Sequence, residues 1–159
     1  MASTAIGSTR NGVGLKAIGR ELPTMPPLET CRREIEALHE FFVDWYAATI
    51  DREAFERLER ALATDFEMIS PEGDRSDRDA VLEWIRESYG RNDPGDFDIE
   101  IRNVELVRSF DDHALVRYEE WQRREGETDA RISTVLFREA ADTPEGIEWV
   151  DLHETALEE

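Results

Sequence analysis

Apolar residues in the first half of the chain recur every three or four positions, the spacing of an amphipathic helix. Three such segments follow one another. The first begins at Thr30, which can cap it, and reaches almost to Asp51, which can cap the second; the second runs to Leu62. The third opens at residues 76–79, which resemble a capping box with aspartate in the acidic place, and stops at Gly90.

The second half alternates apolar and polar residues, with the two-residue period of a half-buried strand. One short strand at residues 66–70 comes earlier and ends in the turn sequence Pro71-Glu72-Gly73. The long strands are expected at residues 97–106, 114–123, 130–138 and 147–156. This order predicts an α+β domain in which three helices of the N-terminal half pack on a strongly curved, mostly antiparallel sheet and leave a pocket.

The first long strand changes its buried face along its length. Phe97 and Ile101 share one parity, whereas Val104 and Leu106 share the other. A change of parity near Asn103 predicts a β-bulge, which would bend the strand sharply.

The turn sequence at Glu125-Gly126 fixes a pairing register for the two strands beside it. A hairpin around this turn places Arg117 opposite Thr134, and in the same way Glu119 opposite Ile132 and Trp121 opposite Ala130. Paired residues share a face of the sheet, and so do residues two apart along a strand. These six side chains are therefore expected on one surface.

Charge limits the classes of partner. The 159 residues carry a net charge of −19, with eighteen arginines and a single lysine. Such an acidic surface repels phosphate backbones, so we expect no nucleic-acid binding. Two explanations for the arginine excess stay open: a GC-rich genome favours arginine codons, and a high-salt cytoplasm favours acidic, lysine-poor surfaces.

Cys31 is the only cysteine, so no internal disulfide can form, which fits a reducing cytoplasm. No stretch approaches the ~20 consecutive apolar residues that a membrane span requires. We therefore expect a soluble, cytoplasmic protein without a membrane partner. No phosphate-binding glycine loop, Cys-x-x-Cys pair or His-Glu-x-x-His helix is present, and we expect no cofactor and no metal.

Residues 1–28 differ from the rest, because they are rich in glycine, serine, threonine and proline and carry a net charge of +2. We interpret them as a flexible tail that precedes one domain at residues 29–159. A targeting segment and a late true start at Met25 are the alternatives.

Five short motifs occur in a characteristic order: residues 46–48, 63–66, 70–73, 114–118, and Trp149 with His153 four positions later. Together with the order of elements they resemble the nuclear transport factor 2-like superfamily, in its SnoaL-like and ketosteroid-isomerase-like branches, over residues 32–157. The resemblance implies a cone-shaped, cystatin-like α+β barrel around a pocket. Members of this superfamily include isomerases, cyclases, dehydratases and association domains, so the fold does not fix the activity.

The resemblance also assigns positions. Tyr46 falls where the ketosteroid isomerases keep the tyrosine of their oxyanion hole, and Ser70 falls where they keep an aspartate base. Thr134 falls at their second oxyanion donor, a protonated aspartic acid. Serine cannot remove a proton from carbon near neutral pH without a base of its own, so the pocket is expected to persist without that chemistry.

If Thr134 points into the pocket, as the resemblance implies, the hairpin register turns its whole face inward. The expected ligand-binding residues are therefore Tyr46, Ser70, Trp84, Arg117, Glu119, Trp121 and Thr134. Arg117 with Glu119 or Glu154 would be either an ordinary buried ion pair or a clamp for a carboxylate or enolate. Tyr46, Trp84 and Trp121 have an ordinary interpretation as core residues.

Candidate catalytic groups are Tyr46, Glu119, Glu154 and His153. On the last strand the same alternation places Val150, Leu152 and Glu154 inside. Trp149, Asp151, His153 and Thr155 would then lie outside, and His153 would pack beside Trp149 in an interface.

The outward face would also hold Val116, Tyr118, Val135 and Phe137. A monomer rarely exposes such an apolar surface, so a homodimer through the outer sheet face is expected. We interpret the remaining histidines as ordinary residues: His39 on the surface of the first helix and His113 at a turn.

The sequence therefore predicts a homodimeric protein with a pocket for an apolar or aromatic molecule that carries one polar group. If it is an enzyme, an isomerase, cyclase or dehydratase reaction fits best. Two alternatives remain: a non-catalytic association or accessory module whose cavity is filled by its own side chains, and an adaptor whose acidic surface binds a basic partner.

Overall fold

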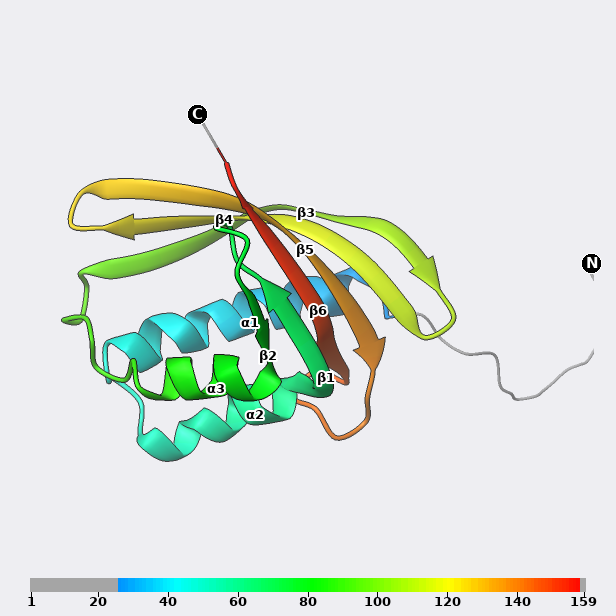
Figure 1. Ribbon diagram of the computed structural model, residues 1–159, viewed down its shortest axis with the longest axis horizontal. Helices are drawn as coiled ribbons and strands as arrows, with labels where there is room; N and C mark the ends of the chain where they lie inside the picture. The colour runs from blue at the N-terminus through cyan, green and yellow to red at the C-terminus, as the bar shows by residue number, and fades with distance from the viewer. Residues whose placement is uncertain (1–25, 158–159) are drawn as a thin grey trace, which may run out of the picture.

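The computed structural model describes residues 26–157, in which helices lie beneath a curved sheet (Figure 1). The helices are α1 (Leu28–Tyr46), the 3-10 helix η1 (Arg52–Phe55), α2 (Glu56–Ala61) and α3 (Arg78–Arg86). The strands are β1 (Leu62–Ile69), β2 (Arg75–Asp77), β3 (Phe97–Phe110), β4 (His113–Arg124), β5 (Glu127–Glu139) and β6 (Ile147–Ala156).

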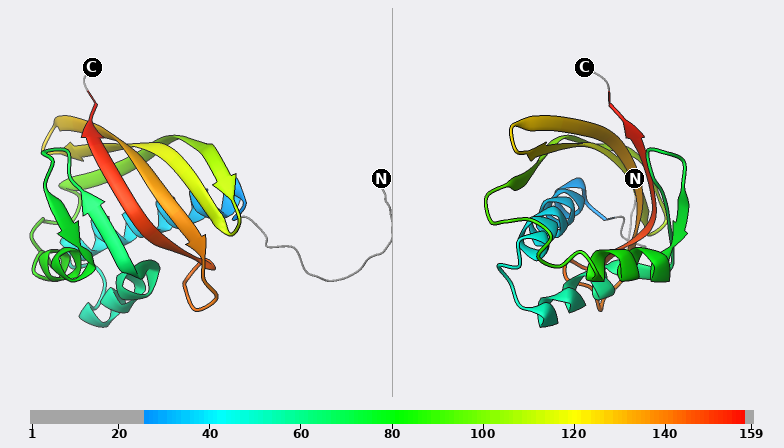
Figure 2. Two further views of the ribbon diagram at one scale, coloured as in Figure 1. Left: turned by 45° about the vertical axis from the view of Figure 1, so that its right-hand side comes forward. Right: turned by 60° about the vertical axis from the view of Figure 1, so that its left-hand side comes forward.

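The strands of this part of the chain form one six-stranded sheet in the order β2-β1-β6-β5-β4-β3. All neighbouring strands are antiparallel except β1 and β6, which run parallel. The sheet stays open, but it curls over α1, as both views in Figure 2 show. The predicted α+β fold with a mostly antiparallel, curved sheet is confirmed; the short strand β2 was not among the predicted strands.

Helix ends differ from the predicted caps. Helix α1 begins at Leu28 after Pro27, and no side chain caps it, so the expected Thr30 cap is wrong. The second helix is interrupted, because η1 precedes α2 and Leu62 already belongs to β1. In α3 the capping residue is Asp77, whose Oδ1 accepts a hydrogen bond from the Ala80 amide at 2.9 Å.

The predicted bulge and hairpin are both present. Asn103 has a φ of +57°, and the pairing of β3 with β4 shifts between Arg102 and Glu105. Glu125 and Gly126 have φ values of +50° and +85°, which close a tight turn, and Arg117 pairs with Thr134. The register of the β4–β5 hairpin is therefore confirmed along its length.

The face of this hairpin that packs against the helices is the opposite of the expected one. Val116, Tyr118, Val135 and Phe137 are all fully buried against the helices. Trp149 of β6 is buried with them, at 1% exposure. The expectation that these residues lie outside is wrong, because a one-residue error in assigning the face inverts every side chain of a strand.

For β6 the predicted inward placement is confirmed for Leu152 and Glu154, in the second half of the strand. The pairing with β5 shifts near Val150, since Phe137 pairs with Trp149 but Leu136 pairs with Asp151. The extra residue lets Trp149 point inward although Leu152, of the other parity, also points inward.

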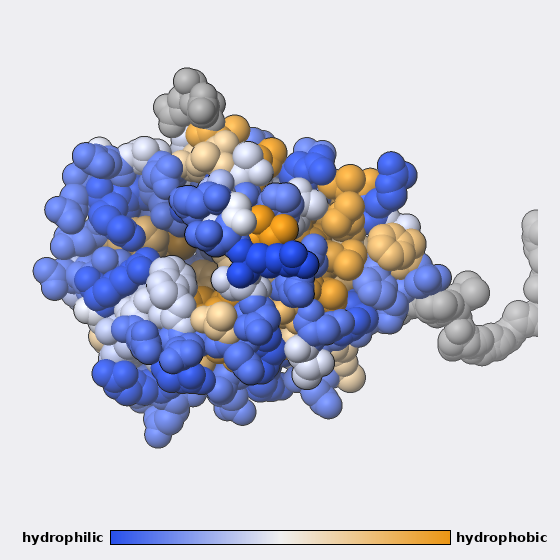
Figure 3. All heavy atoms as spheres, viewed as in Figure 1, coloured by the Kyte–Doolittle hydropathy of each residue, from blue (hydrophilic) through white to orange (hydrophobic). Residues whose placement is uncertain are grey.

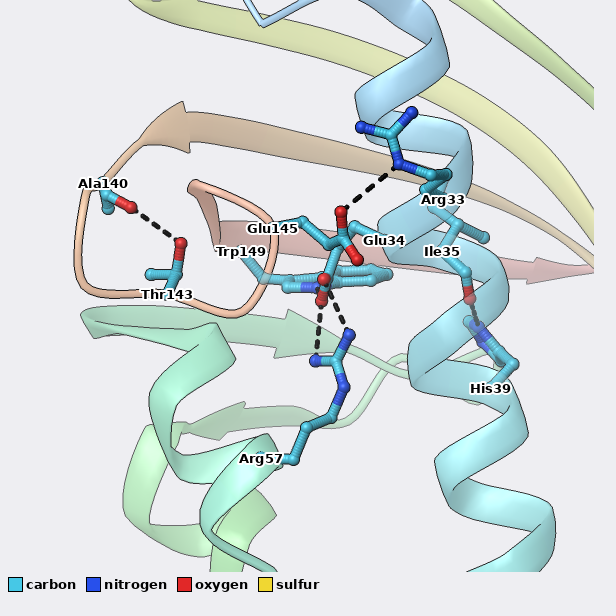
Figure 4. Close-up of polar contacts among 9 residues, drawn as sticks. All are labelled: Arg33, Glu34, Ile35, His39, Arg57, Ala140, Thr143, Glu145 and Trp149. Carbon is cyan, nitrogen blue, oxygen red and sulfur yellow. Dashed lines mark hydrogen bonds and ion pairs between the residues drawn. The ribbon is translucent and has the colours of Figure 1, made fainter.

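A buried carboxylate joins the helices to the sheet (Figure 4). Glu34 of α1 has 0% exposure and accepts two hydrogen bonds from the Arg57 guanidinium of α2, at 2.8 and 3.1 Å. It accepts a third from the Trp149 indole of β6, at 2.8 Å. Around it, Arg33 of α1 pairs with Glu145 of the β5–β6 loop at 3.3 Å.

The predicted N-terminal tail lies outside the described residues, apart from its last three. No helix within the described part of the chain is long and apolar enough to cross a membrane.

Removal of the Arg57 guanidinium should strongly destabilise the protein, because it leaves the buried Glu34 carboxylate without its cation. For Arg57→Ala we expect a loss of about 3 kcal/mol in the free energy of unfolding, measured by urea denaturation. Arg60→Ala, on the exposed side of the same helix, should change this free energy by less than about 0.5 kcal/mol. Equal losses in the two variants would contradict a central role for the Glu34 ion pair.

Candidate functional site

A cavity of about 640 Å³ lies between the inner face of the sheet and the helices. Figure 3 shows it as a hollow with hydrophobic walls between the sheet and α3. Much of the wall is apolar, from Leu38, Phe42, Leu58, Phe66, Val81, Ile85, Phe97, Ile99 and Leu152. Polar side chains gather in two places, at the inner end and at the mouth.

The inner end is built by three neighbouring strands. The hairpin register places Glu120 of β4 opposite Arg131 of β5, and Tyr118 opposite Ser133. Ser133 in turn pairs with Glu154 of β6. Tyr118, Glu120, Ser133 and Glu154 are all buried, so this polar cluster is shielded from solvent on the sheet side.

His39 of α1 completes the cluster from the helical side and is 5% exposed. Its Nδ1 lies 2.7 Å from the Ile35 carbonyl oxygen (Figure 4), and its Nε2 lies 3.2 Å from Glu120 Oε1. Both partners are acceptors, so an imidazolium that donates from both nitrogens satisfies them. Burial opposes the charged ring, but the Glu120 carboxylate outweighs burial and raises the pKa of His39.

Two buried glutamates differ in their proton affinity. Burial raises the pKa of Glu154 to about 7, with help from the negative charge of Glu120, although Arg131 donates to Glu154 at 3.1 Å. For Glu120 burial acts in the same direction, but His39, Gln122 and Arg131 together lower its pKa to about 2. A pair of carboxyls whose environments separate their pKa values in this way is typical of acid–base sites.

The mouth combines aromatic rings with arginines. Tyr46 stacks on Phe42 and meets Phe97 edge-on, with ring centres 5.9 and 6.0 Å apart. Burial raises the pKa of Tyr46 to about 12, so its hydroxyl keeps its proton and can donate a hydrogen bond. Trp84 of α3 also lines the cavity but is 57% exposed, so it borders the opening and does not fill the space.

Of the residues expected to bind a ligand, the structure brings Tyr46, Ser70 and Trp84 to the cavity. The catalytic candidate Glu154 lines it as well. The Ser70 hydroxyl accepts a hydrogen bond from the Asp74 amide at 3.2 Å, which fits the turn-forming alternative for this serine.

The other expected residues lie on the opposite face of the sheet. Arg117, Thr134 and His153 line a separate shallow depression there, in which Arg117 Nε donates to Thr134 Oγ1 at 3.2 Å. Glu119 and Trp121 share this face, and a hydrogen bond from the Trp121 indole lowers the pKa of Glu119. The expectation that Arg117, Glu119, Trp121 and Thr134 line the cavity is wrong, because it rested on an inward Thr134. His153 lies on the outer face, where the sequence analysis had placed it.

Sequence reasoning missed the groups that make the inner end polar. His39 was interpreted as a helix surface residue, yet it occupies the same helix face as the buried Ile35. Glu120 and Arg131 follow from the confirmed register, once Val116 and Tyr118 are placed inside. The apolar character of those two neighbours was the signal available in the sequence.

Comparisons with known proteins place this fold. Residues 32–158 match the model of the family described as Sucrose-6-phosphate phosphohydrolase C-terminal. A comparison with curated proteins returns no match.

Several solved structures are similar. An NTF-2 like protein of unknown function from Pseudomonas aeruginosa shares 32% identity over 81% of this chain and 99% of its own, with a TM-score of 0.73. A CaMKII hub from S. rosetta (15% identity, 82% and 93% coverage, TM-score 0.60) shares the fold alone. So does a putative Ca/calmodulin-dependent kinase II association domain from Exiguobacterium sibiricum (20% identity, 82% and 93% coverage, TM-score 0.53). The chain thus belongs to the NTF2-like proteins and to the family described as Sucrose-6-phosphate phosphohydrolase C-terminal.

Proposed function

We propose that the chain binds a small organic molecule in its cavity and that Glu154 exchanges a proton with it. The supporting observation is the position of Glu154, a buried carboxyl with a pKa of about 7, in the wall of a cavity of about 640 Å³. Ligand pockets typically measure roughly 300–1,000 Å³ and combine apolar walls with a few polar groups. A molecule with an apolar or aromatic body and one polar group fits this lining.

Glu154 suits proton transfer better than the other candidates. A catalytic group works best when its pKa lies near the working pH, because both of its protonation states are then available. Glu120 is held ionised by His39, and Glu119 lies on the other face of the sheet with a lowered pKa.

The corresponding reaction is a proton shift of the isomerase type. The Glu154 carboxylate removes a proton from a carbon beside a carbonyl, and the electron pair moves onto the carbonyl oxygen. The protonated Tyr46 hydroxyl donates a hydrogen bond to that oxygen as its negative charge develops. The Glu154 carboxylic acid then returns the proton to a different atom, so no oxidant or reductant is consumed. Cyclase and dehydratase reactions can begin with the same step.

The alternative function is a non-catalytic association or accessory module. Its support is the likeness to two kinase association domains and the outer face of the sheet, which carries Leu115, Ile132 and Leu136. Figure 3 shows hydrophobic side chains gathered over these strands, and Phe110 beside them is 46% exposed. Either function is compatible with a homodimer that buries this face.

A ligand-dependent proton exchange would test the proposed chemistry. Hydrophobic acids, quinones and steroids are screened by thermal shift, and each compound that stabilises the protein is incubated with it in D2O. We expect exchange of an acidic C–H, followed by NMR, and a loss of about 10²–10⁴-fold in its rate for Glu154→Gln. Exchange that survives in Glu154→Gln but is lost in Glu119→Gln would move the catalytic role to the outer face.

The raised pKa of Glu154 predicts a particular pH dependence of stability. A carboxyl that holds its proton more tightly when folded stabilises the protein while protonated, so this contribution is complete below pH 4.5 and is lost as the pH rises to about 7. Glu154→Gln cannot ionise and should keep roughly 3 kcal/mol that the wild type loses in this interval. Urea unfolding at several pH values measures the difference, and Glu36→Gln, at an exposed position of α1, should follow the wild type.

A charge in the middle of the outer face should disrupt the proposed homodimer. Each partner in a stable dimer typically buries about 800 Å² of mainly well-packed surface. Ile132→Glu would place a carboxylate in that contact, and we expect a monomer by gel filtration with light scattering. The exposed position Thr64 gives the matched control, since Thr64→Glu adds the same charge elsewhere. A wild-type protein that is already monomeric would contradict the proposed dimer.

A further inference from the structure

Two arginines stand at the cavity mouth, each against an aromatic ring. The guanidinium carbon of Arg91 lies 4.0 Å from the ring centre of Tyr46, and that of Arg124 lies 4.6 Å from the ring centre of Phe97. The two rings contact each other, with centres 6.0 Å apart, so the two cations occupy one aromatic site. Both arginines are exposed, and both line the cavity.

The backbone holds both side chains in place. The amides on either side of Arg91 donate to the end of α1, Gly90 to the Trp45 carbonyl at 3.1 Å and Asn92 to the Tyr46 carbonyl at 2.8 Å. Arg124 lies directly opposite Phe97 in the β3–β4 ladder. Arg91 lies in the segment between α3 and β3, but its neighbours tie it to α1, and Arg124 is the last residue of β4. The backbone at both positions is therefore held in place.

These two arginines differ from most of the others in forming no ion pair within the described residues, although Glu127 lies opposite Arg124 in the β4–β5 ladder and Asp129 also lines the cavity. More than half of the arginines in residues 26–157 form an ion pair, as expected in so acidic a chain. Arg91 and Arg124 form none with the carboxylates of that range. A guanidinium stacked on a ring uses its face for the ring, and its N–H edge stays available for two parallel hydrogen bonds to a carboxylate or phosphate.

The opposite rim carries the other sign. Glu72 and Asp74 lie in the turn between β1 and β2, and these strands form the sheet edge opposite β3 and β4. A ligand with one negative group is therefore attracted to the arginine side and repelled from the acidic side. Its remaining atoms then extend along the apolar wall towards the inner end.

We propose that the ligand of this cavity is a small organic anion, whose carboxylate or phosphate is bound by Arg91 and Arg124 while its apolar or aromatic body extends inward. This assignment rests on the proposed function, because it names the class of molecule that the cavity binds.

The test compares three ligands with the same ring system in the full-length protein: 2-naphthoate, 2-naphthyl phosphate and the neutral naphthalene-2-carboxamide. Calorimetry should show that at least one of the anions binds about tenfold more tightly than the amide, the ratio expected for one bidentate charge-assisted pair. Added salt should reduce this preference, because exposed charges are screened. The tighter anion distinguishes a carboxylic acid from a phosphate ester, and either result supports the shared chemistry.

Three variants test whether the preference for an anion depends on Arg91 and Arg124. Arg91→Gln and Arg124→Gln should each bring anion binding close to that of the amide while amide binding stays unchanged. Arg52 stacks on the Tyr89 ring at 4.1 Å but does not line the cavity, so Arg52→Gln removes an equivalent stacked arginine and should keep the preference.

Equal binding of anion and amide by the wild type would overturn the anion assignment and leave the ring-binding cavity intact. So would a preference that survives in folded Arg91→Gln and Arg124→Gln. Failure of all three compounds to bind would count against the proposed function itself.

Discussion

The contact between the Trp149 indole and helix α1 decides which face of the sheet becomes the interior. The indole N–H reaches the Glu34 carboxylate, and its ring packs on Phe137 with centres 4.9 Å apart. Because Glu34 is also held by Arg57, one buried carboxylate ties α1, α2 and β6 together. A lone buried carboxylate would be costly, so the three partners form as a set. Once Trp149 points inward, the pairing of the strands places Val135, Val116 and their neighbours inward too. The cavity is the space that this arrangement leaves beside α1.

The same burial gives the inner end its chemistry. Ionised groups lose hydration there, and each group responds according to its nearest partner. His39 and Glu120 offset the cost of losing hydration by forming an ion pair, because each charge stabilises the other. For Glu154, burial and the negative charge of Glu120 outweigh the attraction of Arg131 and His39, so its neutral form is favoured. Three strands and one helix are needed to produce this asymmetry, and no segment of the sequence contains it alone.

Local patterns in the sequence determined a large part of the fold. The period of apolar residues located the elements, the parity change located the bulge at Asn103, and the Glu125-Gly126 turn set the register of β4 and β5. The face of that hairpin could not be read from the register, since pairing is identical for both orientations. The family resemblance implies an inward Thr134, whereas the apolar character of Val116 and Val135 favours the opposite face inside. The hydrophobic effect favours the latter, and burying two valines, a tyrosine and a phenylalanine outweighs the inward placement of Arg117 and Glu119. The polar inner end was unpredictable for another reason, because the pairing of His39 with Glu120 depends on how α1 crosses the sheet.

The distribution of charge then separates the surface from the cavity. Most carboxylates of this acidic chain are exposed, where water and salt screen them, and they keep molecules apart from one another. The cavity lining is mixed: Arg91, Arg124, Arg131 and a protonated His39 share it with the side chains of Glu72, Asp74, Glu120, Asp129 and Glu154. When Glu154 is protonated, the inner end carries the net charge of its two cations against Glu120 alone. The anion that we propose as ligand therefore depends on the local pair Arg91 and Arg124, since the cavity as a whole is not cationic. The effect of charge in this protein thus depends on where the charged residue lies. The arginine-rich, lysine-poor composition supplies the planar guanidinium groups that stack on aromatic rings at such sites.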